Sequence, residues 1–451
     1  MSRIRQSAKL TGAAGAGVVA ALALAACSPS GAGTADNAPA PEAGADVTWA
    51  CGSEPVTLEA YLETDFPLAE ILFEEFTNQH PNVTFNVRTD EFSVLTQNAP
   101  RVLVDSPPDI MRLPMVSEFA ADGLLFNFDE AADYFGWNDW PGMSQLRVDS
   151  EGRRGEGSIF AMGLNMQMTG VFYNRALAEQ IGMTEAPATL AELDEVMQRA
   201  KDAGITPITQ WNGGAEAGTV FPLQGLMASY GSAADINAWI FQQPGATIDT
   251  PEFREALAHL NRWIEAGFFA EDINALGYGD SLGRFNDEQA LFTFNGNWEA
   301  GNFDADRPGE VGFFAVPPVE EGGAIGAMAA PLTFGTSARA ENAGCAAYFF
   351  NWLATDEVAR TINIETGGSM PMGPADAFMP ELDETTTTAA TLSAAAEVAE
   401  HDGAMDFVAN ATGAIFARGW TPPMQRLVEG GISVDDVLAE VQAVYLDEIG
   451  G

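Results

Sequence analysis

The chain has 451 residues, and its 64 acidic against 20 basic residues give a formal net charge of −44 at pH 7. A surface this acidic repels nucleic acids and anionic lipid headgroups, so we expect no nucleic-acid partner. The length exceeds the size at which a single hydrophobic core stops growing, which predicts two lobes.

The first 27 residues have the pattern of a secretory signal. Basic residues precede an apolar, small-residue run from Thr11 to Ala26, which is too short to span a membrane. The run ends in Leu-Ala-Ala-Cys27, which resembles the bacterial lipoprotein box. We expect residues 1–26 to be a cleaved signal peptide, Cys27 to carry acyl chains that hold the protein at the extracellular face of the cytoplasmic membrane, and residues 27–48 to be a flexible tether. The alternative is an ordinary signal in which Cys27 is incidental.

Two further cysteines, Cys51 and Cys345, remain after Cys27 is assigned to the anchor. The oxidising environment outside the cell permits a disulfide between them, and two separate buried thiols are the alternative. The sequence leaves this choice open.

The next segment alternates between strand and helix patterns. Residues 56–62 and 83–87 have the composition of strands, and apolar residues recur at helical spacing between 68 and 76. A turn at 106–111 leads into a third strand. This order predicts a parallel sheet with crossover helices, which is an α/β fold.

Later helices have recognisable boundaries in the sequence. Thr189 begins a capping box, and Gly204 ends the helix that follows. Thr250, followed by proline, caps a second helix that ends near Gly267. Residues 342–360 are predicted to form one further amphipathic helix.

The sequence lacks the common catalytic motifs. It contains no H-E-x-x-H and no phosphate-binding G-x-x-x-x-G-K, and its three histidines have no metal-ligand spacing. We therefore expect no catalytic residue, no metal and no cofactor. A secreted glycosidase needs only two suitably placed carboxylates, so it stays as an alternative.

Tryptophans beside Gly, Asn or Pro indicate a binding site. They occur in Trp211-Asn212, Asn297-Trp298 and Gly-Trp420-Thr-Pro. An indole face packs on the C–H face of a pyranose, and neighbouring amides reach its hydroxyl groups. These loops predict a carbohydrate-binding site, with burial in a core as the alternative for each single tryptophan.

Residues 170–177 and 181–193 resemble the signature of the family-1 extracellular solute-binding proteins, which are sugar receptors of ABC importers such as the maltodextrin-binding proteins. The likeness extends from residue 53 to about residue 445, through 108–110, 121–125, 285–298 and 316–317. The sequence departs from the family at Gly163, where proline is usual, and around Glu288-Gln289.

The resemblance implies a periplasmic-binding-protein-like fold of two lobes, each with a central sheet flanked by helices. Three hinge crossings are expected, near 162–164, 313–316 and 354–357. Lobe one would comprise 49–163 and 316–355, and lobe two 164–315 and 356–451. A ligand in the cleft would close the hinge, and the membrane permease subunits of an ABC importer would recognise the closed monomer.

Expected ligand contacts follow from the resemblance, from the tryptophan loops and from the carboxyl ends of strands. They are Asp65, Arg112, Gln167, Trp211, Asn212, Glu216, Asn297, Trp298 and Trp420. A receptor for an anionic solute such as a polyol phosphate would need several converging arginines, and these loops offer Arg112 alone. We therefore expect the ligand to be a sugar, in particular an oligosaccharide.

Overall fold

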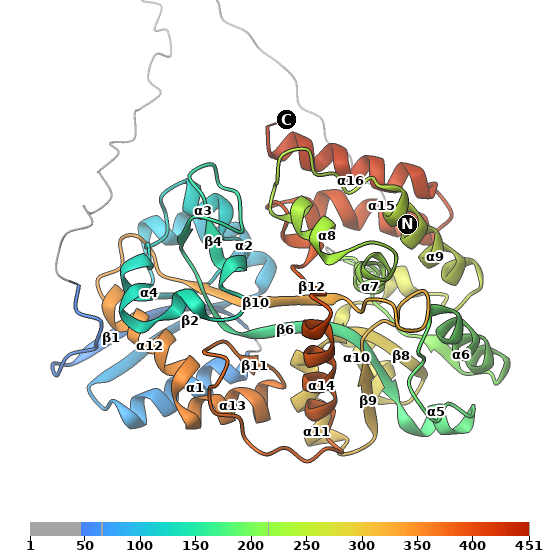
Figure 1. The fold of residues 1–451 in the computed structure, drawn as a ribbon, viewed down its shortest axis with the longest axis horizontal. Coiled ribbons are helices and arrows are strands. Elements are labelled where there is room, and N and C mark those ends of the chain that lie inside the picture. Colours follow the sequence, from blue (N-terminus) through green and yellow to red (C-terminus); the bar gives the residue numbers. More distant parts are fainter. Residues whose placement is uncertain (1–46, 65, 215, 451) are drawn as a thin grey trace, which may run out of the picture. The chain divides into compact units, whose positions relative to one another are not determined.

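The computed structural model describes residues 47–64, 66–214 and 216–450 (Figure 1). The expected signal peptide, Cys27, residues 27–46 of the expected tether and Asp65 lie outside these residues. Within the described part of the chain, no helix is both long enough and apolar enough to cross a membrane.

A single mixed sheet runs through the fold. Its main strands, in spatial order, are β2 (Val83–Asp90), β1 (Val56–Glu63), β3 (Ile110–Arg112), β10 (Ala327–Gly335), β6 (Met162–Asn174), β8 (Ala290–Gly296) and β7 (Thr206–Ile208). The short strands are β4 (Arg147–Val148), β5 (Ser158–Ile159), β9 (Val311–Phe314), β11 (Met370–Pro371) and β12 (Ala404–Met405). The predicted strands at 56–62 and 83–87 are confirmed, and they pair in parallel.

The buried apolar side chains divide the fold into two lobes. Lobe one has one core, around β1, β2 and β3. Its helices are α1 (Pro67–Gln79), α2 (Phe92–Asp105), α3 (Ser117–Ala121), α4 (Asp129–Phe135), α12 (Ala343–Thr355) and α13 (Glu357–Gly367). The helical spacing seen in the sequence buries Leu68, Leu72 and Phe76 of α1 in this core, because these residues share one face of the helix.

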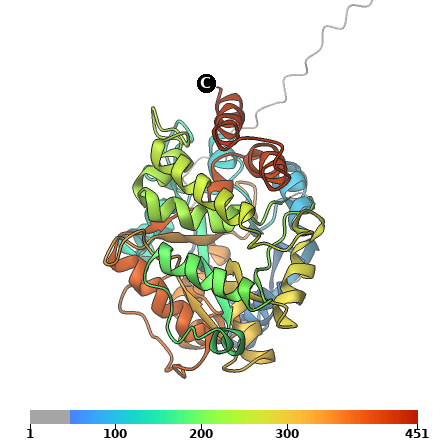
Figure 2. The same cartoon turned by 90° about the vertical axis from the view of Figure 1, so that its right-hand side faces the viewer.

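Lobe two packs helices against both faces of its part of the sheet, with α7, α9 and α16 above the strands and α11 and α14 below them (Figures 1 and 2). Its helices are α5 (Arg175–Gln180), α6 (Leu190–Asp202), α7 (Val220–Tyr230), α8 (Ala233–Ile240), α9 (Pro251–Glu265), α10 (Tyr278–Asn286), α11 (Ala300–Asp306), α14 (Thr387–Glu400), α15 (Thr421–Val428) and α16 (Val434–Glu448). The predicted caps are confirmed: Thr189 accepts a hydrogen bond from Glu192 N, and Thr250 accepts one from Phe253 N.

The helix predicted over 342–360 is wrong as a single element. The structure ends α12 at Thr355 and begins α13 at Glu357. Asp356 between them has an extended backbone, and its carboxylate accepts hydrogen bonds from Val358 N and Ala359 N, each at 3.0 Å. This N-cap favours a new helix start over continuation of the old helix.

Buried apolar side chains pass from one core to another along the chain. Along β6, Leu164 belongs to the core of lobe one and Met168 to a core of lobe two. Along β10, Ala329 belongs to a core of lobe two and Leu332 to the core of lobe one. Met372, after α13, is still buried in the core of lobe one.

A disulfide joins Cys51 to Cys345, across a sequence separation of 294 residues. Both cysteines lie in the core of lobe one. The bond ties the segment before β1 to helix α12.

Candidate functional site

Four partly exposed aromatic rings form a line on lobe two. Trp298, Phe221, Phe407 and Phe416 come from three separate segments of the chain. Their ring centroids follow one another at 6.2, 5.2 and 5.5 Å. We call these four residues the aromatic strip. Neighbouring rings are inclined to one another by 73°, 49° and 83°, so each ring leaves only part of its apolar surface to a ligand.

The indole of Trp298 packs against the backbone of Gly296 and forms a hydrogen bond at its edge. A Cβ at Gly296 would lie 1.8 Å from this ring, so only glycine at that position leaves room for the indole. At the edge, Trp298 Nε1 donates a hydrogen bond to the hydroxyl of Tyr278 at 2.9 Å. Both contacts fix the orientation of the ring before any ligand arrives.

Tyr278 in turn donates its hydroxyl proton to Glu299 Oε1 at 2.5 Å. The residue is 36% exposed, but its hydroxyl end faces Trp298, Asn295 and Glu299. Burial of that end, followed by the charge of Glu299, raises the pKa of Tyr278 well above its usual value. The hydroxyl therefore stays protonated and keeps both hydrogen bonds.

On lobe one, Arg112 lies at the carboxyl end of β3. Its guanidinium stacks over the ring of Phe92 at 5.3 Å, and its Nη1 donates hydrogen bonds to the backbone oxygens of Leu113 at 2.6 Å and Thr333 at 3.3 Å. Its Nε lies 3.7 Å from Glu63 Oε1, a distance too long for a hydrogen bond, and is left without a partner. Burial lowers the pKa of Arg112, yet a guanidinium remains charged in proteins.

Glu216 of lobe two approaches Glu63 of lobe one. Burial, and then the charge of Glu63, raises the pKa of the Glu216 carboxyl. Glu63 lies at the end of β1, whereas Glu216 belongs to the loop before α7. Glu63 and Arg112 of lobe one and Glu216 of lobe two can accept or donate hydrogen bonds to hydroxyl groups.

Two of the predicted amides serve the fold. Asn297 is buried, accepts a hydrogen bond from Met168 N at 3.0 Å and donates one to Met166 O at 3.2 Å. Asn212 is also buried and accepts a hydrogen bond from the hydroxyl of Thr219 at 2.6 Å. The amide of Asn297 thus bonds to the backbone of β6, whereas that of Asn212 bonds to side chains, and both residues are at most 2% exposed.

Trp211 and Gln167 are likewise buried, with 4% and 7% of their surface exposed. Trp211 packs between Phe221 and Tyr278, at centroid distances of 5.0 and 4.7 Å, and so supports the aromatic strip from beneath. The side chain of Gln167 donates a hydrogen bond to Asn165 at 2.6 Å.

The structure places Trp420, another expected ligand contact, away from the surface. Its side chain is fully buried in the core of lobe two, where it packs edge-on against Trp239 at 6.3 Å. Phe407 and Phe416, from the same late segment, occupy the strip instead. Sequence reasoning missed these two phenylalanines and Tyr278, because an aromatic residue among apolar neighbours has the same pattern in a core and at its edge.

The two lobes touch beside the strip. A cavity of about 20 Å³ lies between them and is lined by Met115, Glu118, Arg154, Thr333 and Asp406, among others. This volume holds one water molecule and excludes a sugar ring. Glu118 of lobe one accepts a hydrogen bond from Gly413 N of lobe two at 3.2 Å, so the lobes are in direct contact here. Among the residues described, no group of three His, Cys, Asp or Glu side chains could hold a metal ion.

The sequence model of the family "Bacterial extracellular solute-binding protein" matches residues 62–360. A similar protein is the "Multiple sugar-binding protein" of Streptococcus mutans, 24% identical over 314 residues, which cover 66% of this chain and 71% of that protein. Among solved structures, a "Chitin oligosaccharide binding protein" superposes with a TM-score of 0.72 at 18% identity, over 88% of this chain and all of the other. RafE in complex with raffinose gives a TM-score of 0.67 at 19% identity, over 87% of this chain and all of the other. These structural likenesses establish the fold.

Proposed function

We propose that this chain, which belongs to the bacterial extracellular solute-binding proteins, captures a carbohydrate and delivers it to an ABC importer. Members of this family are binding proteins and not enzymes, and they work outside the cytoplasm. Similar proteins carry names that refer to sugars, namely multiple sugars, chitin oligosaccharide and raffinose.

The aromatic strip is the observation that carries this proposal. Trp298, Phe221, Phe407 and Phe416 lie 5.2 to 6.2 Å apart, a spacing comparable to the length of one sugar unit. The exposed parts of these rings together offer an extended apolar surface, against which the C–H groups of an oligosaccharide can pack. A monosaccharide would use only one of these rings.

Polar groups of both lobes supply the specificity. The buried Nε–H of Arg112 has an ion-pair partner in Glu63 but no hydrogen-bond partner, and Glu63 and Glu216 offer acceptor oxygens from opposite lobes. A sugar has donors and acceptors on each ring, so it satisfies both kinds of group at once. A phosphorylated solute would instead meet two carboxylates for a single arginine, which opposes its binding.

We further propose that residues 1–26 are a signal peptide and that Cys27 carries the lipid anchor. The lipobox-like sequence before Cys27 and the small-residue tether after it support this proposal. Expression of the full chain with Cys27→Ser should shift the protein from the membrane fraction to the soluble extracellular fraction. Retention of the variant on the membrane would contradict the assignment.

A thermal-shift screen of monosaccharides and oligosaccharides tests the carbohydrate proposal. A ligand at 100 times its Kd adds about 2.7 kcal/mol to the free energy of unfolding. Trp298→Ala should abolish the shift given by the best oligosaccharide, while the melting temperature without ligand changes little, because Trp298 lies at the edge of the core.

The matched control is Tyr134→Ala, which removes a 67% exposed aromatic ring from α4 of lobe one and should leave the ligand shift intact. Absence of a shift with every saccharide would contradict the proposed function. Release of reducing ends on incubation with an oligosaccharide would point to a glycosidase instead.

A further inference from the structure

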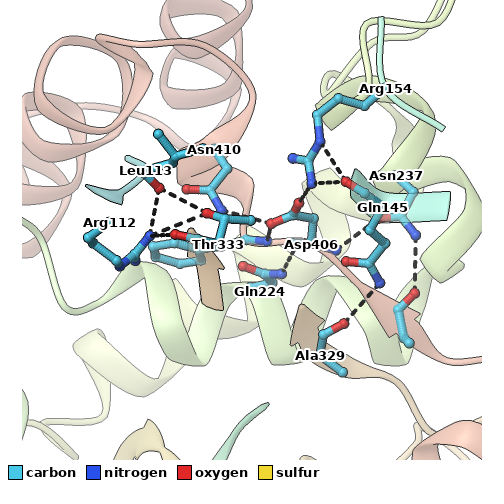
Figure 3. A network of polar contacts seen from close by, with 12 residues as sticks. Arg112, Leu113, Gln145, Arg154, Gln224, Asn237, Ala329, Thr333, Asp406 and Asn410 are labelled. Carbon is cyan, nitrogen blue, oxygen red and sulfur yellow. Dashed lines mark hydrogen bonds and ion pairs between the residues drawn. The ribbon is translucent and has the colours of Figure 1, made fainter. Parts of the chain in front are cut away.

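One loop of lobe one reaches lobe two. Strands β4 and β5 form a hairpin whose Val148 and Ile159 are buried in the core of lobe one. The loop between the strands requires glycine at position 157. Gly157 has a φ of +92°, and a Cβ there would lie 2.3 Å from Val148 O. This loop presents Arg154 toward lobe two (Figure 3).

The backbone of Arg154 is bound by lobe two on both sides. Its N–H donates a hydrogen bond to Phe241 O at 3.3 Å, and its carbonyl accepts one from Gln243 Nε2 at 3.1 Å. The guanidinium also lies over the ring of Phe241 at 4.8 Å. Phe241 and Gln243 directly follow α8 of lobe two.

The side chain of Arg154 makes an ion pair with Asp406 of lobe two (Figure 3). Only 6% of the arginine side chain and 2% of the aspartate side chain are exposed. The pair has further partners, since Arg154 Nε donates to Gln145 O at 3.1 Å and Asp406 accepts from Asn410 Nδ2 at 2.8 Å. Asp406 also accepts a hydrogen bond from the backbone N–H of Phe407, a member of the aromatic strip.

A charge pair at a lobe boundary responds to the separation of the lobes. When the lobes are together, each charge is buried and depends on the other for its compensation. When they separate, water solvates both charges. Removal of one partner therefore leaves an uncompensated buried charge only in the closed arrangement, and it destabilises that arrangement selectively.

We propose that Arg154 and Asp406 form a latch that holds the two lobes together without contacting the ligand. The latch sets the fraction of protein in the closed arrangement, before and after a ligand binds. Its effect on affinity rests on the proposed carbohydrate function, whereas its effect on lobe separation does not. The pair can form only when the lobes are in contact, and capture of a ligand between the lobes needs that contact, so its loss should weaken apparent affinity.

Small-angle X-ray scattering of the unliganded protein tests the latch directly. Arg154→Ala should increase the radius of gyration relative to the wild type. The control is Arg153→Ala, which removes a neighbouring arginine whose ion pair with Glu151 stays within the same loop. This control should leave the radius of gyration unchanged. An unchanged value for Arg154→Ala would overturn the proposal, whether or not a sugar ligand is found.

Isothermal titration with the best oligosaccharide gives the second measurement. Arg154→Ala should weaken binding about tenfold, mainly through faster dissociation, because the liganded lobes reopen more readily. Arg154→Lys keeps the charge but loses the planar stacking on Phe241, so it should give an intermediate Kd. If Arg154→Ala fails to fold, Arg154→Lys and Asp406→Asn carry the test. Wild-type affinity and wild-type scattering in these variants would show that the pair has only a structural role.

Discussion

Glu216 is the residue whose protonation should report most directly on the approach of the lobes. Its pKa is raised by burial and by the charge of Glu63, so the folded state favours the protonated carboxyl. The stabilisation from this group is therefore complete below the usual glutamic acid pKa of 4.5 and is lost as the pH rises through the raised pKa. Glu216→Gln keeps the uncharged form at every pH and should be more stable than the wild type at pH 7.

Urea denaturation at several pH values between 4 and 8 measures this difference. The gain in the free energy of unfolding for Glu216→Gln should shrink toward zero as the pH falls to 4, where the wild-type carboxyl is protonated in both states. Glu70→Gln, at an exposed position on α1, serves as the control and should show no such trend. A gain that is independent of pH would contradict the electrostatic origin.

Single residues also mark the limit of what the sequence predicts about the site. Trp298 stands beside asparagine and Trp420 beside glycine, which are similar loop-like surroundings in the sequence, yet Trp298 is partly exposed and Trp420 is fully buried. The difference arises from tertiary packing, since Trp239 and other side chains of lobe two enclose Trp420. The residues next to each tryptophan contain no information about this enclosure. Both tryptophans could therefore be predicted as ligand contacts, but the sequence could not show which of them is buried.

At the scale of elements, Asp356 determines where α12 ends and α13 begins. Its carboxylate caps two backbone N–H groups of α13. Asp356→Ala should lower the free energy of unfolding by about 1 kcal/mol, because both groups lose their partner. Chemical denaturation followed by circular dichroism measures this loss.

Asp356→Asn is the matched variant for this cap. Asparagine caps helices about as well as aspartate, so its free energy of unfolding should stay close to that of the wild type. A loss for asparagine as large as that for alanine would mean that the charge, and not the hydrogen bonds, matters here.

The start of a helix could be predicted from the sequence where residues close to that start determine it. The caps at Thr189 and Thr250 mark helix starts in both sequence and structure, because a hydroxyl and a nearby backbone N–H suffice. The break at Asp356 was missed because apolar residues continue at helical spacing on both sides of it.

At the scale of the whole molecule, the sheet of lobe one continues into the sheet of lobe two. Strand β6 pairs with β10 along Met162–Met168 and with β8 along Thr169–Tyr173. A single long strand thus serves both lobes, and its hydrogen bonds link the lobes through the hinge. Strand pairing over such sequence distances is set by the fold as a whole, whereas alternating strands and helices already indicated the α/β class.

The net charge of −44 should make the stability of the whole molecule depend on salt. Like charges repel more strongly in the compact state than in the expanded chain, and salt reduces this repulsion. The screening length falls from about 30 Å at 0.01 M to about 8 Å at 0.15 M ionic strength. The melting temperature should therefore rise by several degrees over this range of sodium chloride, as measured by differential scanning calorimetry. At pH 4 many carboxylates are protonated, and the rise should be smaller. An equal rise at both pH values would show that salt acts on hydration and not on charge repulsion.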